Sequence, residues 1–363
     1  MTELAWRVLR DGPAPLLDVD PATAERTPLH VAVVLPSLPV GSGGHNVVFQ
    51  LVLGLEALGH TCSLWVLDGP ESLELPGALR HKAREHYAAV AAPVFRGLAD
   101  WYGADVALAT SWETAYAVAS LPGCRARAYL LNDHEPEFHP TSVERELAER
   151  SYGLGLHGIA ASPWLRDIYT GYGGIASRFG YGVDHAVYRP QPGPRQRDTI
   201  VFYARAATPR RAVPLGVAAL ARLRERRPDL RVVAFGDREP PSFPAEHAGV
   251  RSPPELARLF GEGTVGMCLS LTNYSLVPQE MLACGLPCVD LDRPGTRSVY
   301  GDDGPVLLAP FDPDALAGAL DRLLGDEAEW ERRSRAGVAL VAERTWPRAA
   351  AQVEAGVRDA LRR

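Results

Sequence analysis

One stretch of the chain, residues 270–290, combines the residue types that binding of a phosphorylated sugar requires. Its sequence, SLTNYSLVPQEMLACGLPCVD, predicts a strand end, a polar loop at 272–275, a helix over 279–284 and a second strand. A loop that leads into a helix presents unpaired backbone N–H groups and the positive end of the helix dipole to an anion. Glu280, placed by this prediction in the first turn of the helix, can accept hydrogen bonds from both hydroxyls of a diol such as ribose. The stretch therefore indicates a nucleotide-sugar site, while an ordinary loop and helix with a surface glutamate fits it equally well.

Three arginines, Arg205, Arg210 and Arg211, follow the strand predicted at residues 199–203 in the second half of the chain. Ligands of parallel α/β sheets lie at the carboxyl ends of the strands. Guanidinium groups at such a position suit bidentate contact with a diphosphate, whose charge they would neutralise as it leaves. A basic turn on the surface is the alternative, and the position at a strand end favours a functional role for Arg205.

A glycine-rich segment, PSLPVGSGGHN, follows the apolar run at residues 29–35 and leads into a long helix. The order strand, glycine-rich loop, helix and strand is typical of a βαβ unit with an anion-binding loop. Gly41, Gly43 and Gly44 would let the backbone approach a phosphate closely. Many such turns carry glycine for geometry alone, so this loop by itself is a weak indication.

A dense polar cluster, NDHEPEFHP, follows the strand predicted at residues 127–131. It includes Asp133 and His134, and its place at the carboxyl end of a strand favours a role in binding or catalysis. The alternatives are a surface loop with solvated charges and a metal site. The two histidines, His134 and His139, stand on either side of a proline, and further ligands at a suitable spacing are lacking, so we expect no metal.

The composition of the 363-residue chain is that of a globular protein, with 46% hydrophobic and 23% charged residues. With a net charge of −6, the chain lacks the excess of positive charge that is typical of nucleic-acid-binding proteins, so we expect no nucleic-acid partner. The sequence has no run approaching the roughly 20 apolar residues of a membrane span and no signal-like start. We therefore expect a cytoplasmic protein, for which peripheral contact with a membrane stays open. The five cysteines lack metal-like spacing and are expected to be buried and reduced.

Apolar strands alternate with helices through most of the chain, which is typical of an α/β fold with parallel sheets. The segment PQPGPRQRD has the composition of a linker, and we place a domain boundary there. Residues 90–98 are expected to form a helix. The predicted organisation is a first domain at 1–190, a second domain at 191–345 and a final helix within 346–363.

Four segments resemble the GT-B glycosyltransferases, and in detail glycosyltransferase family 4, whose members are retaining enzymes that use nucleotide-activated sugars. They are GSGGHN, FGYGVDHAVYRP, ARAATPR and NYSLVPQEMLACGLPCV, and they extend over about residues 29–311, most of the chain. The last is similar to the family's Glu-x7-Glu region, which is a specific pattern, whereas the glycine loop is not. The resemblance implies two Rossmann-like domains facing each other across a donor-binding cleft, with the last helix returning to the first domain. It also implies a bacterial, metal-independent transferase without a cofactor.

The resemblance carries roles over to particular residues. Glu280 matches the second glutamate of the pair, which holds the ribose, and Arg205 matches the arginine of the family's Arg…Lys pair. Arg210 stands where the lysine is usual, which keeps the charge and changes the geometry. In such enzymes the leaving phosphate takes the acceptor's proton, so Asp133 and His134 are assigned to orienting the sugar or acceptor and stabilising charge at the anomeric carbon. The other donor-binding positions implied are Gly43, Gly44, Ser275, Leu276 and Val277.

The chain departs from the family pattern at the sugar pocket. Thr272 replaces the first glutamate of the pair, and Asn273 follows it where glycine is usual. With Tyr274, these residues offer smaller or neutral polar groups, which fits a deoxysugar with fewer hydroxyls. The whole combination of motifs looks most like a branch that includes bacterial rhamnosyltransferases using dTDP-rhamnose. The expected donor is a dTDP-sugar, with UDP- and GDP-sugars as alternatives, and the expected acceptor is a hydroxyl of a saccharide or a small natural product.

Two other functions stay open from the sequence. A sugar-nucleotide 2-epimerase of the same architecture would use carboxylates and histidine, here Asp133, His134 and Glu135, for acid–base chemistry on the sugar ring. A non-catalytic nucleotide-sugar-binding partner subunit would explain the loss of the first glutamate, although Arg205 and Glu280 are retained.

Overall fold

The computed structural model describes residues 2–67, 75–193 and 195–363. The chain divides into two compact units, which are described separately. Unit 1 comprises Met1–Tyr181 with Trp346–Arg363, and unit 2 comprises Gly182–Thr345. Within the described residues, no helix has both the length and the apolar character needed to cross a membrane.

Unit 1 is built on a parallel sheet that has seven strands in the described part of the chain, in the order β3-β2-β1-β4-β5-β6-β7. The interior strand β1 (HVAVVL) is almost wholly buried, as expected for a parallel sheet covered by helices on both faces. The strands are β1 His30–Leu35, β2 Thr61–Val66, β3 Val94–Arg96, β4 Ala104–Ala109, β5 Cys124–Leu131, β6 His157–Ala160 and β7 Ile175–Arg178.

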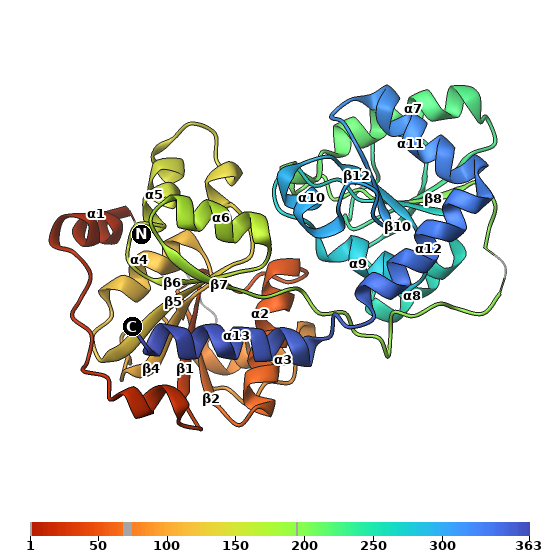
Figure 1. Ribbon diagram of the computed structural model, residues 1–363. Helices are drawn as coiled ribbons and strands as arrows, with labels where there is room; N and C mark the ends of the chain where they lie inside the picture. Colours follow the sequence, from red (N-terminus) through yellow and green to blue (C-terminus); the bar gives the residue numbers. More distant parts are fainter. Residues whose placement is uncertain (1, 68–74, 194) are drawn as a thin grey trace. The chain divides into compact units, whose positions relative to one another are not determined.

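The last helix of the chain, α13 (Trp346–Leu361), belongs to unit 1 and packs on α2 (Gly43–Ala57), as Figure 1 shows. The contact is close because Gly54 lies under Ala350, where a Cβ on the glycine would be 2.3 Å from the alanine Cβ. A hydrogen bond of 2.9 Å between His60 Nε2 and Glu354 Oε1 also joins α13 to the loop before β2. The other helices of unit 1 are α1 Thr2–Asp11, η1 Pro21–Glu25, α3 Pro76–His86, α4 Trp112–Ser120, η2 Glu135–Phe138, α5 Val143–Ser151 and α6 Pro163–Gly171.

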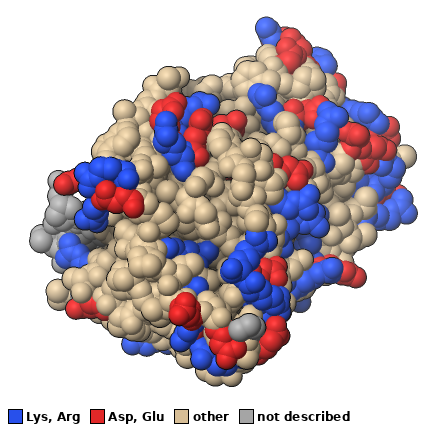
Figure 2. All heavy atoms as spheres, turned by 60° about the vertical axis from the view of Figure 1, so that its left-hand side comes forward, with Lys and Arg blue, Asp and Glu red and all other residues tan. Residues whose placement is uncertain are grey.

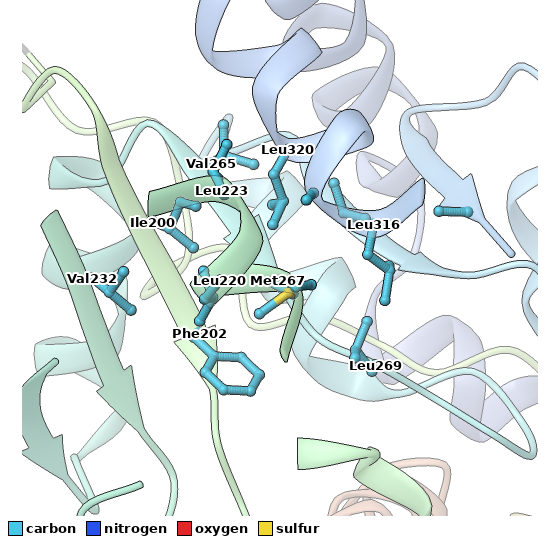
Figure 3. Close-up of a cluster of buried hydrophobic side chains, with 14 of the residues drawn as sticks. Ile200, Phe202, Leu220, Leu223, Val232, Val265, Met267, Leu269, Leu316 and Leu320 are labelled. Atoms are coloured by element: carbon cyan, nitrogen blue, oxygen red, sulfur yellow. The ribbon is translucent and has the colours of Figure 1, made fainter. Parts of the chain in front are cut away.

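Unit 2 has a second parallel sheet, with six strands among the described residues in the order β10-β9-β8-β11-β12-β13. Apolar side chains of β8 and β11 pack against those of α7 (Val213–Arg226) and α11 (Pro313–Gly325), as shown in Figure 3. The strands are β8 Thr199–Tyr203, β9 Arg231–Phe235, β10 Glu246–Gly249, β11 Val265–Met267, β12 Cys288–Leu291 and β13 Val306–Ala309. The other helices are η3 Pro209–Arg211, α8 Pro253–Glu262, α9 Leu276–Ala283, α10 Pro294–Tyr300 and α12 Glu327–Val341.

The boundary between the units lies after Tyr181, not after residue 190 as predicted. The residues that follow Tyr181 pack within unit 2: the Val183 N–H donates to Arg344 O over 2.8 Å, and the Tyr188 ring stacks on Phe260. The predicted linker includes residue 194, which lies outside the described residues. Arg195 is held firmly, because its guanidinium donates to three backbone carbonyls, those of Phe260, Gly263 and Cys284.

Several predicted elements also need correction. Residues 90–98 contain no helix; Val94–Arg96 forms the short edge strand β3, which pairs with β2. The short strands β7 and β10 and helix α10 were not predicted, because they lack a clear apolar run or period.

The five cysteines are confirmed as buried and free. Acidic and basic side chains are interspersed on the face shown in Figure 2, where neither sign forms one continuous field.

Candidate functional site

Two loops of unit 2 meet at the carboxyl ends of β8 and β11. These strands are neighbours in the sheet, and β12 lies next to β11. The Leu271 N–H donates to Arg210 O over 3.0 Å, and Arg211 Nη1 donates to Ser270 Oγ over 2.6 Å. The loop with the arginines and the loop that leads to Glu280 are therefore joined directly, although they are far apart in the sequence.

Asp290 connects the neighbouring strand β12 to the loop that follows β11. The sequence analysis assigned no role to this residue. Its side chain is fully buried in β12, and Oδ1 accepts hydrogen bonds of 2.7 Å from the backbone N–H groups of Ser270 and Leu291. Burial raises the pKa of Asp290 to about 8, and the Arg211 guanidinium is among the groups that oppose this shift. The sequence does contain one indication of this role, because Asp290 is an acidic residue inside an otherwise apolar strand, CVDL.

Helix α9 begins at Leu276, earlier than the predicted start at residue 279. Pro278 fits the first helical turn because the missing N–H of a proline would have no partner there. Ser275 is the N-cap residue, and its Oγ accepts the Val277 N–H over 3.4 Å. The N–H groups of Leu276 and Val277 thus lie in the first turn, where the helix dipole favours an anion. The polar residues before them, Thr272, Asn273, Tyr274 and Ser275, are all buried.

Because α9 starts earlier, Glu280 lies beyond its first turn, and the predicted first-turn placement is wrong. Its side chain is half-buried. Burial raises the pKa of Glu280 to about 8, and the Tyr188 hydroxyl partly offsets this shift. Glu280 is therefore no solvated surface carboxylate.

Gly285, with φ +70°, ends the helix in the left-handed conformation expected from the sequence.

Arg205 and Arg210 are half-buried residues of the loop after β8. Backbone hydrogen bonds shape this loop: Thr208 N–H donates to Arg205 O over 3.1 Å, and Ala207 N–H donates to Asp237 Oδ2 over 3.1 Å. The Arg211 guanidinium lies over the Tyr203 ring, 5.9 Å from the centroid, and donates to Ser270 Oγ. These contacts give Arg211 a positioning role in the loop.

In unit 1, Gly43 and Gly44 are the first two residues of α2, after the N-cap residue Ser42. Among the described residues, a Cβ on Gly43 would have no atom within 4 Å, and one on Gly44 would reach only Ser42 Oγ at 4.0 Å. Packing against the described part of the chain therefore does not require glycine at either position. The His45 ring fixes the loop, with Nδ1 2.8 Å from Ser42 Oγ and Nε2 2.8 Å from Ser37 O. The result is a helix N-terminus with open space beside it, as an anion-binding loop requires.

The polar cluster after β5 contains a carboxyl with an altered pKa at Glu135. Its Oε2 accepts the Trp112 N–H over 2.5 Å and the Tyr129 hydroxyl over 3.1 Å. Burial, with the nearby Glu113 charge, raises the pKa of Glu135 to about 8. Glu135 thus joins the start of α4 to the end of β5 and holds the loop on which Asp133 and His134 stand.

Asp133 and His134 are both half-buried. Asp133 Oδ1 accepts the His134 N–H over 2.9 Å, and His134 Nδ1 lies 3.2 Å from the Tyr152 hydroxyl. Burial lowers the pKa of His134, which favours the neutral ring. Among the described residues no group of three or more histidine, cysteine, aspartate and glutamate side chains is arranged to hold a metal ion.

Comparison with known sequences identifies relatives of part of the chain. Residues 197–326 match the sequence model of a family described as Glycosyl transferases group 1. That range includes Arg205, Arg210 and Glu280, whereas Asp133 and His134 lie outside it. Over 250 residues, or 64% of this chain, the sequence is 35% identical to the O-antigen biosynthesis protein RfbC of Myxococcus xanthus. The chain spans only 19% of the length of that curated relative.

Solved structures match nearly the whole chain. Sucrose-phosphate synthase of Thermosynechococcus elongatus is 17% identical with a TM-score of 0.69, and the match covers 90% of this chain and 97% of that one. Anabaena HepE, solved in complex with UDP and glucose, is 15% identical with a TM-score of 0.68, covering 92% and 99%. A glycosyltransferase of Rickettsia africae is 13% identical with a TM-score of 0.69, covering 93% and 99%. These matches confirm the predicted α/β fold of GT-B type.

Proposed function

We propose that this chain is a glycosyltransferase that moves a sugar from a nucleoside-diphosphate donor to a saccharide hydroxyl. One observation carries the proposal: the loop with Arg205 and Arg210 is hydrogen-bonded to the loop that leads into α9, the helix of Glu280. Connected segments at one edge of the sheet thus supply three groups. These are the positive charge of the arginines, the N–H groups in the first turn of α9 and the Glu280 carboxyl that we propose binds the nucleoside sugar. The match of residues 197–326 to the glycosyl transferases group 1 family supports this assignment.

The donor diphosphate is held by Arg205, Arg210 and the N–H groups of Leu276 and Val277. The guanidinium groups and the helix dipole stabilise the charge that develops as the nucleoside diphosphate leaves. The Glu280 carboxyl holds the sugar of the nucleoside. The complex of HepE with UDP and glucose supports a nucleotide-sugar donor for this fold.

The sugar that is transferred is a deoxysugar such as rhamnose, and dTDP-rhamnose is the favoured donor. Thr272, Asn273 and Tyr274 give the sugar pocket neutral polar groups in place of a carboxylate. The acceptor is a saccharide of a cell-surface polymer, which the similarity to an O-antigen biosynthesis protein supports. We place the reaction in the cytoplasm.

Transfer proceeds with retention, and no metal takes part. The leaving phosphate removes the proton from the acceptor hydroxyl, so no dedicated nucleophile is required. Asp133 and His134 orient the acceptor and stabilise positive charge at the anomeric carbon. The glycine loop at Gly43 and Gly44 accommodates the diphosphate or the transferred sugar in the open space beside it.

Product analysis with dTDP-rhamnose and a panel of bacterial cell-surface saccharides tests this function. Release of dTDP that depends on the acceptor, with a rhamnoside of the same anomeric configuration as the donor by NMR, is expected. Conversion of the sugar nucleotide without an acceptor would instead identify an epimerase. Binding of a nucleotide sugar without turnover on any acceptor would instead favour a non-catalytic partner subunit.

A further inference from the structure

The Ser270 hydroxyl joins the two loops that are proposed to hold the donor diphosphate. Ser270 lies in the loop that follows β11, and its side chain is only 1% exposed. Its Oγ accepts a hydrogen bond of 2.6 Å from Arg211 Nη1, and its backbone N–H donates to Asp290 Oδ1 over 2.7 Å. Because the hydroxyl and the backbone have separate partners, a substitution that removes the hydroxyl can leave the bond to Asp290 in place.

Arg211 carries this contact to the loop that follows β8, residues 204–212, here called the arginine loop. It is the last residue of η3, and its guanidinium lies over the ring of Tyr203, the last residue of β8, 5.9 Å from the centroid. At the neighbouring position, the Leu271 N–H donates to the Arg210 carbonyl over 3.0 Å. A side-chain bond and a backbone bond therefore connect the arginine loop to the loop that leads into α9.

The arginine loop is held in a conformation that its sequence disfavours. Ala212, the residue after Arg211, has φ 43° and ψ 40°, in the left-handed region where a residue with a Cβ is uncommon. Ala212 both ends η3 and caps α7, so the chain turns here from one helix directly into the next. Residues in this region persist where the surrounding contacts determine the conformation. The bond from Arg211 to Ser270 is such a contact, because it fixes the residue next to Ala212.

We propose that Ser270 is a positioning residue for the donor, which acts through Arg211 to hold the arginine loop against the start of α9. A diphosphate that bridges the guanidinium groups of Arg205 and Arg210 and the N–H groups in the first turn of α9 requires both loops in one fixed arrangement. When the loops are less firmly joined, binding has to order them, and the affinity falls by that cost. The proposal deepens and rests on the proposed function, in which these loops bind a nucleoside diphosphate.

A double-mutant cycle measured with dTDP tests the proposal. Calorimetric titration gives the dTDP affinity of the full wild-type chain, of Ser270→Ala, of Arg211→Met and of the double variant. Ser270→Ala should weaken binding by about tenfold, the effect expected of one hydrogen bond from a charged group. In the Arg211→Met background the same substitution should have no further effect, because the serine has lost the partner through which it acts. A residue that only packs the fold would weaken binding equally in both backgrounds.

Two further variants control for folding. Ser270→Cys nearly keeps the volume of the side chain with a weaker acceptor and should show the same pattern, so the test does not depend on the stability of Ser270→Ala. Ser334→Ala removes a hydroxyl of α12 that donates to Gly285 O over 2.8 Å, in the same unit, and should keep the wild-type affinity. Unfolding midpoints verify that each variant is folded at the temperature of the titration.

Wild-type affinity in both Ser270 variants, or losses that add up in the double variant, would overturn the role of Ser270 while leaving nucleotide binding established. Failure of the wild-type chain to bind dTDP, UDP, GDP or ADP would contradict the proposed function itself, and this inference with it.

Discussion

Oδ1 of Asp290 accepts a 2.7 Å hydrogen bond from the backbone N–H of Ser270, so a buried carboxyl of β12 holds the loop that follows β11. The same loop is held from β8 through Arg211, which donates to Ser270 Oγ. Ser270 is thus the residue at which the ends of three neighbouring strands are connected. The loop that leads to Glu280 takes its position from this connection.

Asp290→Asn should change how the free energy of unfolding depends on pH. The folded-state pKa of Asp290 is raised to about 8, so the native state retains a proton that the unfolded chain has lost. The wild-type chain therefore loses stability as pH rises from about 4 to about 8, and the asparagine variant lacks this loss. Relative to wild type, the variant should gain roughly 2–4 kcal/mol between about pH 5 and pH 8.

Denaturant unfolding of both proteins at the two pH values measures this difference. Glu280 and Glu135 also have raised pKa values, but their contributions are common to both proteins and cancel. A difference between variant and wild type that stays constant with pH would show that Asp290 is ionised in the folded chain.

Removing the Glu135 side chain should destabilise unit 1. Glu135→Ala leaves the Trp112 N–H at the start of α4 and the buried Tyr129 hydroxyl without their shared acceptor. We expect a loss of about 1–3 kcal/mol in the free energy of unfolding, the typical effect of an unsatisfied buried donor. Glu135→Gln keeps an acceptor oxygen and should lose less than half as much. Equal losses for the two variants would mean that the hydrogen bonds do not stabilise the fold.

Substitution by alanine at two glycines of α2 should affect different properties, donor binding at Gly43 and stability at Gly54. At Gly43 an added Cβ meets no atom of a described residue within 4 Å, so Gly43→Ala should leave the unfolding midpoint unchanged. It should weaken donor binding by about tenfold, because the methyl group enters the space proposed for the donor. At Gly54 the added Cβ would be 2.3 Å from Ala350 Cβ, so Gly54→Ala should lower the midpoint by separating α2 from α13. Nucleotide titrations and thermal scans of both variants measure these effects. Wild-type donor affinity in Gly43→Ala would exclude this loop from the donor site.

The alternation of strands and helices could be predicted because buried parallel strands are short apolar runs, as at β1 and β8. Helix-capping residues could also be predicted from the sequence, and Asp312 is confirmed as the N-cap of α11. The predicted start of α9 was wrong, since the helix begins at Leu276 and includes Pro278 in its first turn, where a proline is acceptable. The contact of Asp290 with Ser270 joins residues distant in sequence, and no local pattern encodes such a pair. Side-chain burial, which raises the pKa of Glu280 and Asp290, is likewise a property of the folded chain alone.

Thermal stabilisation by nucleoside diphosphates tests the central claim most directly. The full chain is heated with dTDP, UDP, GDP or ADP, without divalent metal, because a ligand that binds the native state raises the unfolding midpoint. We predict a clear rise, largest with dTDP, that is lost in Arg205→Ala and retained in Arg222→Ala, an exposed arginine of α7 in the same unit. The same midpoint with all four nucleotides as without them would contradict a nucleotide-sugar site at this sheet edge.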